Sequence, residues 1–68
     1  MNQKQAERQA AKASKTQGAQ YVVWVYDQGR EVYDSEQVRR YAPFLQIESV
    51  WIDGAMVTSE HAAAQVPA

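Results

Sequence analysis

Carboxylate side chains that could act as an acid–base pair occur twice, as Asp27 with Glu31 and as Asp34 with Glu36. Two carboxyl groups can transfer protons to a substrate when a cleft shifts the pKa of one of them. Here the first pair belongs to a predicted turn and the second to a predicted helix start, where carboxylates hydrogen-bond to backbone N–H groups. We therefore interpret both pairs as structural and expect no enzymatic activity.

The other residue types that carry chemistry are too sparse for a catalytic, metal or cofactor site. The chain has no cysteine and one histidine, His61, which excludes thiolate and histidine-cluster metal sites. The serines have no histidine arranged to activate them, and the three glycines are too isolated to form a phosphate-binding loop. We interpret His61 as a solvated residue and expect neither a metal nor a cofactor.

The charged residues divide the chain into a basic segment and an acidic remainder. Residues 1–18 contain four basic residues against one acidic residue, which gives +3, whereas residues 19–68 contain three against seven, which gives −4. The formal net charge of −1 conceals this asymmetry, which is typical of a protein with an interaction tail. The basic residues of the first segment are Lys4, Arg8, Lys12 and Lys15.

The large apolar side chains, those other than alanine, gather in the middle of the chain. Eighteen of the twenty fall between Tyr21 and Val57. This distribution predicts a basic polar arm (1–20), a compact domain (21–58) and a short tail (59–68). The arm is rich in helix-forming residues but has no apolar stripe, so we expect a frayed helix or a disordered segment that gains order only on a partner.

No apolar run in the chain approaches the ~18–20 residues that a membrane-spanning helix needs. The N-terminus also lacks the apolar stretch of a secretory signal. We therefore expect a soluble, cytoplasmic protein without a membrane partner. Its brevity and its lack of catalytic groups are typical of phage or mobile-element accessory proteins.

A first hairpin is predicted from the six consecutive β-branched and aromatic residues at positions 21–26. Gly29 can supply the positive φ of a tight turn, and residues 31–33 return the chain. A two-residue loop made of Gln28 and Gly29 would pair Trp24 with Tyr33.

A short helix and a second hairpin complete the compact domain. Asp34 begins a helix-start signature, and Pro43 ends the helix because proline disfavours helical geometry in the residue before it. Asp53-Gly54 is a strong hairpin signal between the strands at 47–52 and 55–58. The predicted fold class is α+β: a small antiparallel sheet of two hairpins in the order ββαββ, with one short helix packed on one face.

An aromatic patch is predicted on the face of the sheet that the short helix leaves open. Side chains alternate along a strand, so Val32 would meet the helix and the patch would comprise Trp24, Tyr26 and Tyr33. A domain this small, without disulfides or metal, needs additional burial from an oligomer or a partner. Exposed apolar patches rich in Trp and Tyr tend to be interaction sites. The alternative is that these rings are half-covered surface residues.

These features favour a non-enzymatic protein-binding module, acting as a small homodimer or as an accessory or inhibitory subunit of a larger protein. The aromatic patch would anchor the partner, and Arg39 and Arg40 would form ion pairs at its rim. The acidic body would face a basic target. The exposed edges of the sheet offer a second route to a partner, by strand addition.

Nucleic-acid binding is the alternative function. The basic arm would contact phosphates together with Arg39 and Arg40, and the aromatic side chains of the sheet would stack on bases. The acidic body and the sequence pI of about 5.7 argue against this reading, because nucleic-acid-binding domains are usually strongly basic.

Overall fold

The computed structural model describes residues 1–57, which form two α-helices and a four-stranded antiparallel sheet. The elements are α1 (Gln3–Ser14), β1 (Gln20–Val25), β2 (Gly29–Asp34), α2 (Ser35–Tyr41), the 3-10 turn η1 (Ala42–Phe44), β3 (Leu45–Ile52) and β4 (Ala55–Met56). The predicted tail, with His61, lies outside the described residues, as does the last residue of the predicted fourth strand.

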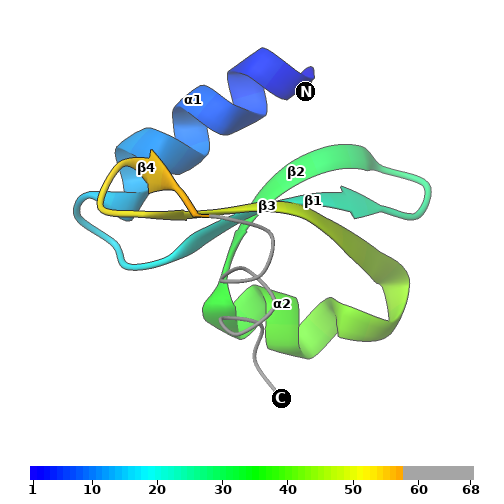
Figure 1. Cartoon of the computed structure of the whole chain (residues 1–68). Helices are drawn as coiled ribbons and strands as arrows, with labels where there is room; N and C mark the ends of the chain where they lie inside the picture. The colour runs from blue at the N-terminus through cyan, green and yellow to red at the C-terminus, as the bar shows by residue number, and fades with distance from the viewer. Residues whose placement is uncertain (58–68) are drawn as a thin grey trace.

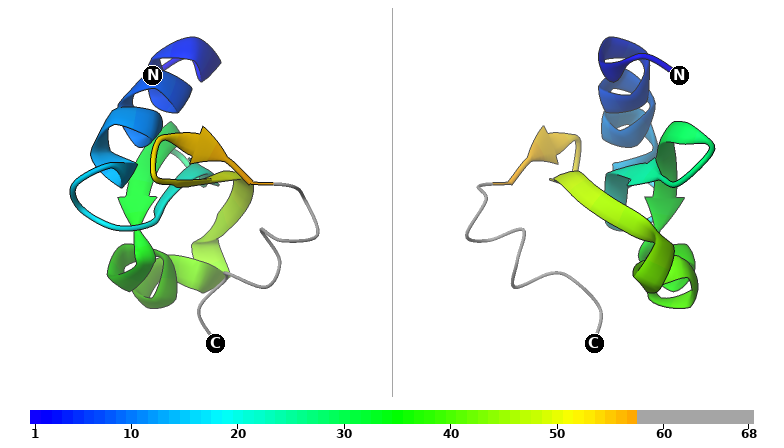
Figure 2. Two further views of the ribbon diagram at one scale, coloured as in Figure 1. Left: turned by 60° about the vertical axis from the view of Figure 1, so that its left-hand side comes forward. Right: turned by 90° about the vertical axis from the view of Figure 1, so that its right-hand side faces the viewer.

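The sheet lies between the two helices. Its strands follow the order β2-β1-β3-β4, so β1 is central. Helix α1 covers one face and α2 the other (Figure 1; Figure 2). The predicted α+β class with an antiparallel sheet is confirmed, but the order ββαββ is incomplete because α1 precedes β1 and belongs to the fold.

Helix α1 is well formed because its start is capped and its sequence is rich in helix formers. The side chain of Asn2 accepts a hydrogen bond from the backbone N–H of Gln5 at 2.8 Å. In return, the Gln5 side chain accepts one from the backbone N–H of Asn2 at 3.1 Å. This capping box satisfies two N–H groups that the helix itself cannot pair.

The docking of α1 on the sheet corrects the expectation of an arm that orders only on a partner. Ala6 and Ala10 are fully buried, and they pack on Val22 with Val32 and Trp51 beside them. The prediction required large apolar side chains on the helix. Instead the sheet supplies the large side chains, and the small alanines let the helix backbone approach them closely.

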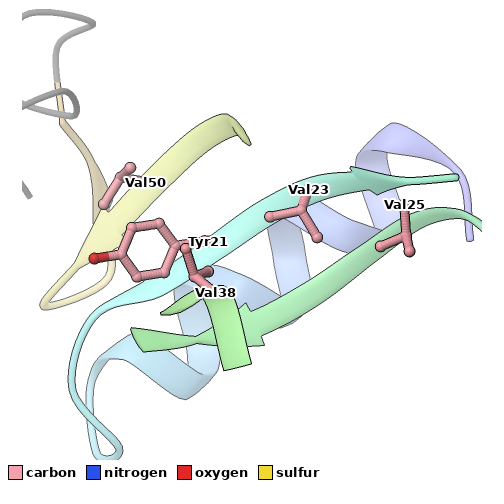
Figure 3. Packing of buried hydrophobic residues seen from close by; sticks show 5 residues of the cluster. All are labelled: Tyr21, Val23, Val25, Val38 and Val50. Carbon is pink, nitrogen blue, oxygen red and sulfur yellow. The ribbon is translucent and has the colours of Figure 1, made fainter. Parts of the chain in front are cut away.

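The larger part of the core lies on the other face of the sheet, under α2. Its buried residues are Tyr21, Val23 and Val25 of β1, Val38 of α2 and Val50 of β3 (Figure 3). These positions alternate along β1, as expected for side chains that share one face of a strand. The core therefore uses β1 on both faces, since Val22 meets α1.

The start and the end of α2 agree with the sequence signals. The side chain of Asp34 caps the helix by accepting a hydrogen bond of 2.8 Å from the backbone N–H of Gln37. The regular helix ends at Tyr41, and Pro43 lies in the 3-10 turn that follows. This turn leads directly into β3.

The predicted register of the first hairpin is wrong. Trp24 lies opposite Arg30, and Val25 lies opposite Gly29, so the loop contains the three residues from Tyr26 to Gln28. Asp27 takes a positive φ of 72° within this loop. Aspartate tolerates that conformation better than most residues, which makes the longer loop accessible.

The new register exchanges the faces of two β2 residues. Val32 was expected under the short helix but packs beside Val22 on the α1 face. Tyr33 was expected on the open face but packs on the α2 face. A shift of pairing by an odd number of residues always moves the side chains of one strand to the opposite face.

The second hairpin has the predicted register. Trp51 lies opposite Met56 and Ile52 opposite Ala55. The backbone N–H of Val57 donates a hydrogen bond of 2.9 Å to the carbonyl oxygen of Val50. The two-residue turn between these strands fixes this pairing.

Candidate functional site

An exposed aromatic cluster lies at the end of the sheet where β1 ends and β3 begins. Its members are Trp24, Tyr26 and Phe44, which are 48%, 75% and 68% exposed. Together with Pro43, Leu45 and Gln46 they line an open, largely apolar groove. We call Trp24, Tyr26 and Phe44 the aromatic end.

The aromatic end differs from the predicted patch by one residue. Tyr33 is half-buried on the α2 face, where its ring centroid lies 5.7 Å from that of Tyr41. Phe44 takes its place, although sequence reasoning gave it no role. The sequence signal that could have identified Phe44 is Pro43. Because Pro43 ends the helix, Phe44 lies outside the apolar stripe by which the helix packs.

The backbone holds the two segments of the aromatic end together. The N–H of Tyr26 donates a hydrogen bond of 3.2 Å to the carbonyl oxygen of Phe44. The neighbouring residues Val25 and Leu45 are paired across β1 and β3. Trp24 lies in β1, and this hydrogen bond ties Tyr26, at the start of the β1–β2 loop, to Phe44, the last residue of η1.

Trp24 is supported by a charged pair that spans the sheet. The guanidinium carbon of Arg30 lies 6.0 Å from the centroid of the Trp24 ring, within the range of a cation–π contact. Arg30 also donates two hydrogen bonds to the carboxylate of Glu48, at 2.5 and 3.2 Å. This hydrogen bonding to Glu48 raises the pKa of Arg30. The pair links β2 to β3 and holds Arg30 against Trp24.

Arg39 and Arg40, the predicted rim residues, lie in the last turn of α2 and are exposed. Arg40 donates a hydrogen bond of 2.9 Å to Glu36, one turn earlier in the same helix. Arg39 forms no ion pair within residues 1–57. Of the two, only Arg39 therefore presents a charge that no described residue neutralises.

Three of the four basic residues of the arm lie in one row along α1, and the fourth follows at its C-cap. Lys4, Arg8 and Lys12 are spaced by four residues, which places them on the side of the helix opposite the buried Ala6 and Ala10. Lys15 caps the C-terminal end of the helix, and its side chain lies against Gly54. All four are exposed, and none forms an ion pair with another described residue. We call Lys4, Arg8, Lys12 and Lys15 the basic row.

The acidic residues of the body do not gather on one surface. Asp27 lies in the β1–β2 turn and Asp53 in the β3–β4 turn, at opposite ends of the sheet (Figure 1). Asp34 caps α2, and Glu36 and Glu48 are paired with arginines. The positions of these five residues are explained by turns, a helix cap and ion pairs, whereas Glu31 lies in β2 opposite Val23.

Within residues 1–57, no group of three or more acidic or histidine side chains is placed to hold a metal ion. No helix in this part of the chain is long and apolar enough to cross a membrane. Comparison with protein-family models, with curated proteins and with solved structures found no match. The aromatic end and the basic row are therefore the two candidate binding surfaces of residues 1–57.

Proposed function

We propose that this chain is a non-enzymatic protein-binding module that docks through the aromatic end. The observation that carries the proposal is the exposure of Trp24, Tyr26 and Phe44, three large rings that line one groove at the end of the sheet. Aromatic side chains bury much area at little entropic cost, and Trp and Tyr dominate the energetic centres of protein interfaces.

Single exposed apolar residues are common on protein surfaces, but a group of them that forms a groove is typical of an interaction site. The docking of α1 on the sheet removes one of the reasons for expecting a partner. Because α1 covers the face that was expected to be open, no partner is needed to cover that face. The proposal rests on the aromatic end alone.

The partner is a second copy of this chain, or a larger protein of which this chain is an accessory or inhibitory subunit. A standard interface buries ~800 Å² on each side, more than three side chains provide. The additional area is available beside the aromatic end. Strand β4 pairs only with Trp51 and Ile52 of β3, so the first half of β3 has no neighbouring strand on its outer side within residues 1–57. A partner strand can add there.

The test compares two variants of the full chain that each replace exposed apolar residues. One carries Trp24→Ser and Phe44→Ser, and the control carries Met56→Ser on β4, where Met56 is 59% exposed. Sedimentation equilibrium measures self-association, and quantitative pull-down from the native host measures binding to other proteins. We expect the first variant to lose the association and the control to keep it.

Two outcomes contradict the proposal. One is a wild-type chain that stays monomeric at all concentrations and retains no protein from the host. The other is an association that survives in the Trp24→Ser, Phe44→Ser variant. Circular dichroism of both variants checks that the fold is intact, which exposed positions should allow.

A further inference from the structure

We infer that α1 is a second binding surface, separate from the aromatic end, which contacts the sugar–phosphate backbone of a nucleic acid through the basic row. The row comprises Lys4, Arg8, Lys12 and Lys15. Phosphate contacts by Lys and Arg supply most of the sequence-independent affinity for nucleic acids.

The spacing of the basic row suits a regular polyanion. A step of four residues along a helix advances ~6 Å, and the whole row spans ~16 Å. Along one strand of a duplex the phosphates advance ~3.4 Å per nucleotide, so two nucleotides advance ~6.8 Å. A row of ~16 Å is therefore long enough to face several phosphates of one strand.

The basic row is held on a fixed scaffold. The capping box orders the start of α1. On the side of the helix that faces the sheet, the buried Ala6 and Ala10 pack against Val22. At the C-terminal end of α1, the side chain of Lys15 lies against Gly54. A Cβ added to Gly54 would lie only 2.5 Å from the Cε of Lys15. Because the helix is already ordered, binding does not have to order its backbone.

The acidic side chain of α1 faces away from the basic row. Glu7 is the one acidic residue in the helix, and its carboxylate accepts a hydrogen bond of 3.1 Å from the side chain of Gln3. Both residues line a hollow that they share with Arg30 and Glu48 of the sheet. Arg30 therefore lies near Glu7, and the basic row keeps a uniform positive charge.

A polar groove borders the row and supplies hydrogen-bonding groups. It runs between α1 and β2 and is lined by Lys12 of the row with Gln9, Thr16, Gln17 and Gln20. Amide and hydroxyl side chains commonly contact phosphate and sugar oxygens in protein–nucleic acid complexes. Asp34 also lines the groove, but its carboxylate already accepts the backbone N–H of Gln37.

The observations favour a nucleic acid over the other polyanions. A membrane surface requires apolar side chains for insertion, and α1 has no residue larger than alanine among its apolar positions. An acidic protein surface would also satisfy the charges, but its carboxylates do not form a continuous line as the phosphates of a nucleic acid do. The groove of amides beside the row fits a ligand that carries many hydrogen-bond acceptors.

The test is fluorescence anisotropy of a labelled duplex of about two helical turns, ~20 base pairs, titrated with the full chain. DNA and RNA duplexes of the same sequence identify which nucleic acid is preferred. Four phosphate contacts predict a slope of about −3.6 in the plot of log K against log salt, or roughly a hundredfold loss between ~50 and ~200 mM salt.

A matched pair of charge variants locates the surface. Arg8→Gln with Lys12→Gln removes two charges from the basic row, and Arg39→Gln with Arg40→Gln removes two charges from α2. We expect the first variant to weaken binding at low salt and to reduce the salt slope by about 1.8, whereas the second keeps the wild-type slope.

Three outcomes would overturn the inference. The first is that neither duplex changes its anisotropy at low salt. The second is that both variants lose affinity equally, which would indicate attraction to net charge without a defined surface. The third is that anionic lipid vesicles or polyglutamate compete as well as the duplex does, which would indicate a polyanion other than a nucleic acid as ligand.

Discussion

The hydroxyl oxygen of Ser14 accepts a hydrogen bond of 2.8 Å from the backbone N–H of Gly54, 40 residues further along the chain. The same hydroxyl donates to the carbonyl oxygen of Ala11 at 2.9 Å. Ser14 is buried at the C-terminal end of α1, and Gly54 lies in the turn between β3 and β4. Helix α1 is therefore joined to the sheet by a specific polar contact as well as by packing.

Replacing Ser14 by alanine should destabilise the protein by about 1–2 kcal/mol, because the N–H of Gly54 loses its partner. Urea unfolding measures the free energy, and hydrogen exchange at Gly54 should become faster. Thr16→Ala is the control, since Thr16 is exposed just beyond the helix. Equal stability of the two variants would show that this hydrogen bond does not hold α1.

Enlarging a buried alanine of α1 should also be costly. Ala10→Leu places a larger side chain where Ala10 is fully buried against Val22, and overpacking of this kind costs about 1–3 kcal/mol. Gln9→Leu introduces the same side chain at an exposed position of the same helix. We expect only the first variant to lower the urea midpoint. A midpoint that is unchanged in Ala10→Leu would contradict the docking of α1.

The docking of α1 could not be predicted from the arm alone, because it depends on the partner face. Alanines at positions 6 and 10 bury little area by themselves, and their value comes from Val22, Val32 and Trp51 opposite them. Which residues of β2 share that face depends on the register of the first hairpin. The spacing of the alanines opposite the four basic residues was the available signal.

The two hairpins show why one register could be predicted and the other could not. Asp53-Gly54 favours a two-residue turn, and that turn fixes the pairing of Trp51 with Met56. In the first hairpin, Asp27 and Gly29 both accept a positive φ, so the residue types allow more than one loop length. The composition of the strands did not decide between the registers, since either one pairs apolar residues.

The sequence predicted two of the three residues of the aromatic end, and the third depends on how the strands pair. Trp24 and Tyr26 come from the strand that sequence patterns identify most strongly. Phe44 reaches them only because β1 pairs with β3, a contact between segments that are distant along the chain. Pairing of this kind depends on tertiary packing and leaves little local signal.

The stability of the protein should fall at alkaline pH through Tyr33. Burial raises the pKa of Tyr33 above its ordinary value of 10.0, and Glu31 and Tyr41 raise it further. The folded state thus favours the neutral phenol. Its contribution to stability is complete below pH 10.0 and is lost as the pH rises from 10.0 through the folded-state pKa, because the unfolded chain ionises first.

This pH dependence can be assigned with two phenylalanine variants. The free energy of unfolding is measured by urea titration between about pH 8 and pH 11, the range that spans tyrosine ionisation. Tyr33→Phe should show a shallower alkaline loss than the wild type, whereas Tyr26→Phe, at an exposed position, should keep the wild-type slope. A wild-type slope in Tyr33→Phe would assign the alkaline loss to other groups.

The ion pair between Arg30 and Glu48 should contribute more to stability than the pair between Arg40 and Glu36. Arg30 makes two hydrogen bonds to Glu48, and their side chains are 23% and 32% exposed, against 60% and 72% for the other pair. Less exposed, bidentate pairs are screened less by water and salt. Exposed pairs within one helix typically contribute about 0.3–0.5 kcal/mol.

Double-mutant cycles with glutamine at each charged position measure the two coupling energies. We expect a larger coupling energy for Arg30 with Glu48 than for the helical pair, whose coupling should vanish at high salt. The cycle also reports on the aromatic end, because Glu48 holds Arg30 over Trp24. Glu48→Gln should therefore change the tryptophan fluorescence, and Glu36→Gln should not. Equal coupling in both cycles, with unchanged fluorescence, would mean that the cross-strand pair does not position Arg30 against the ring.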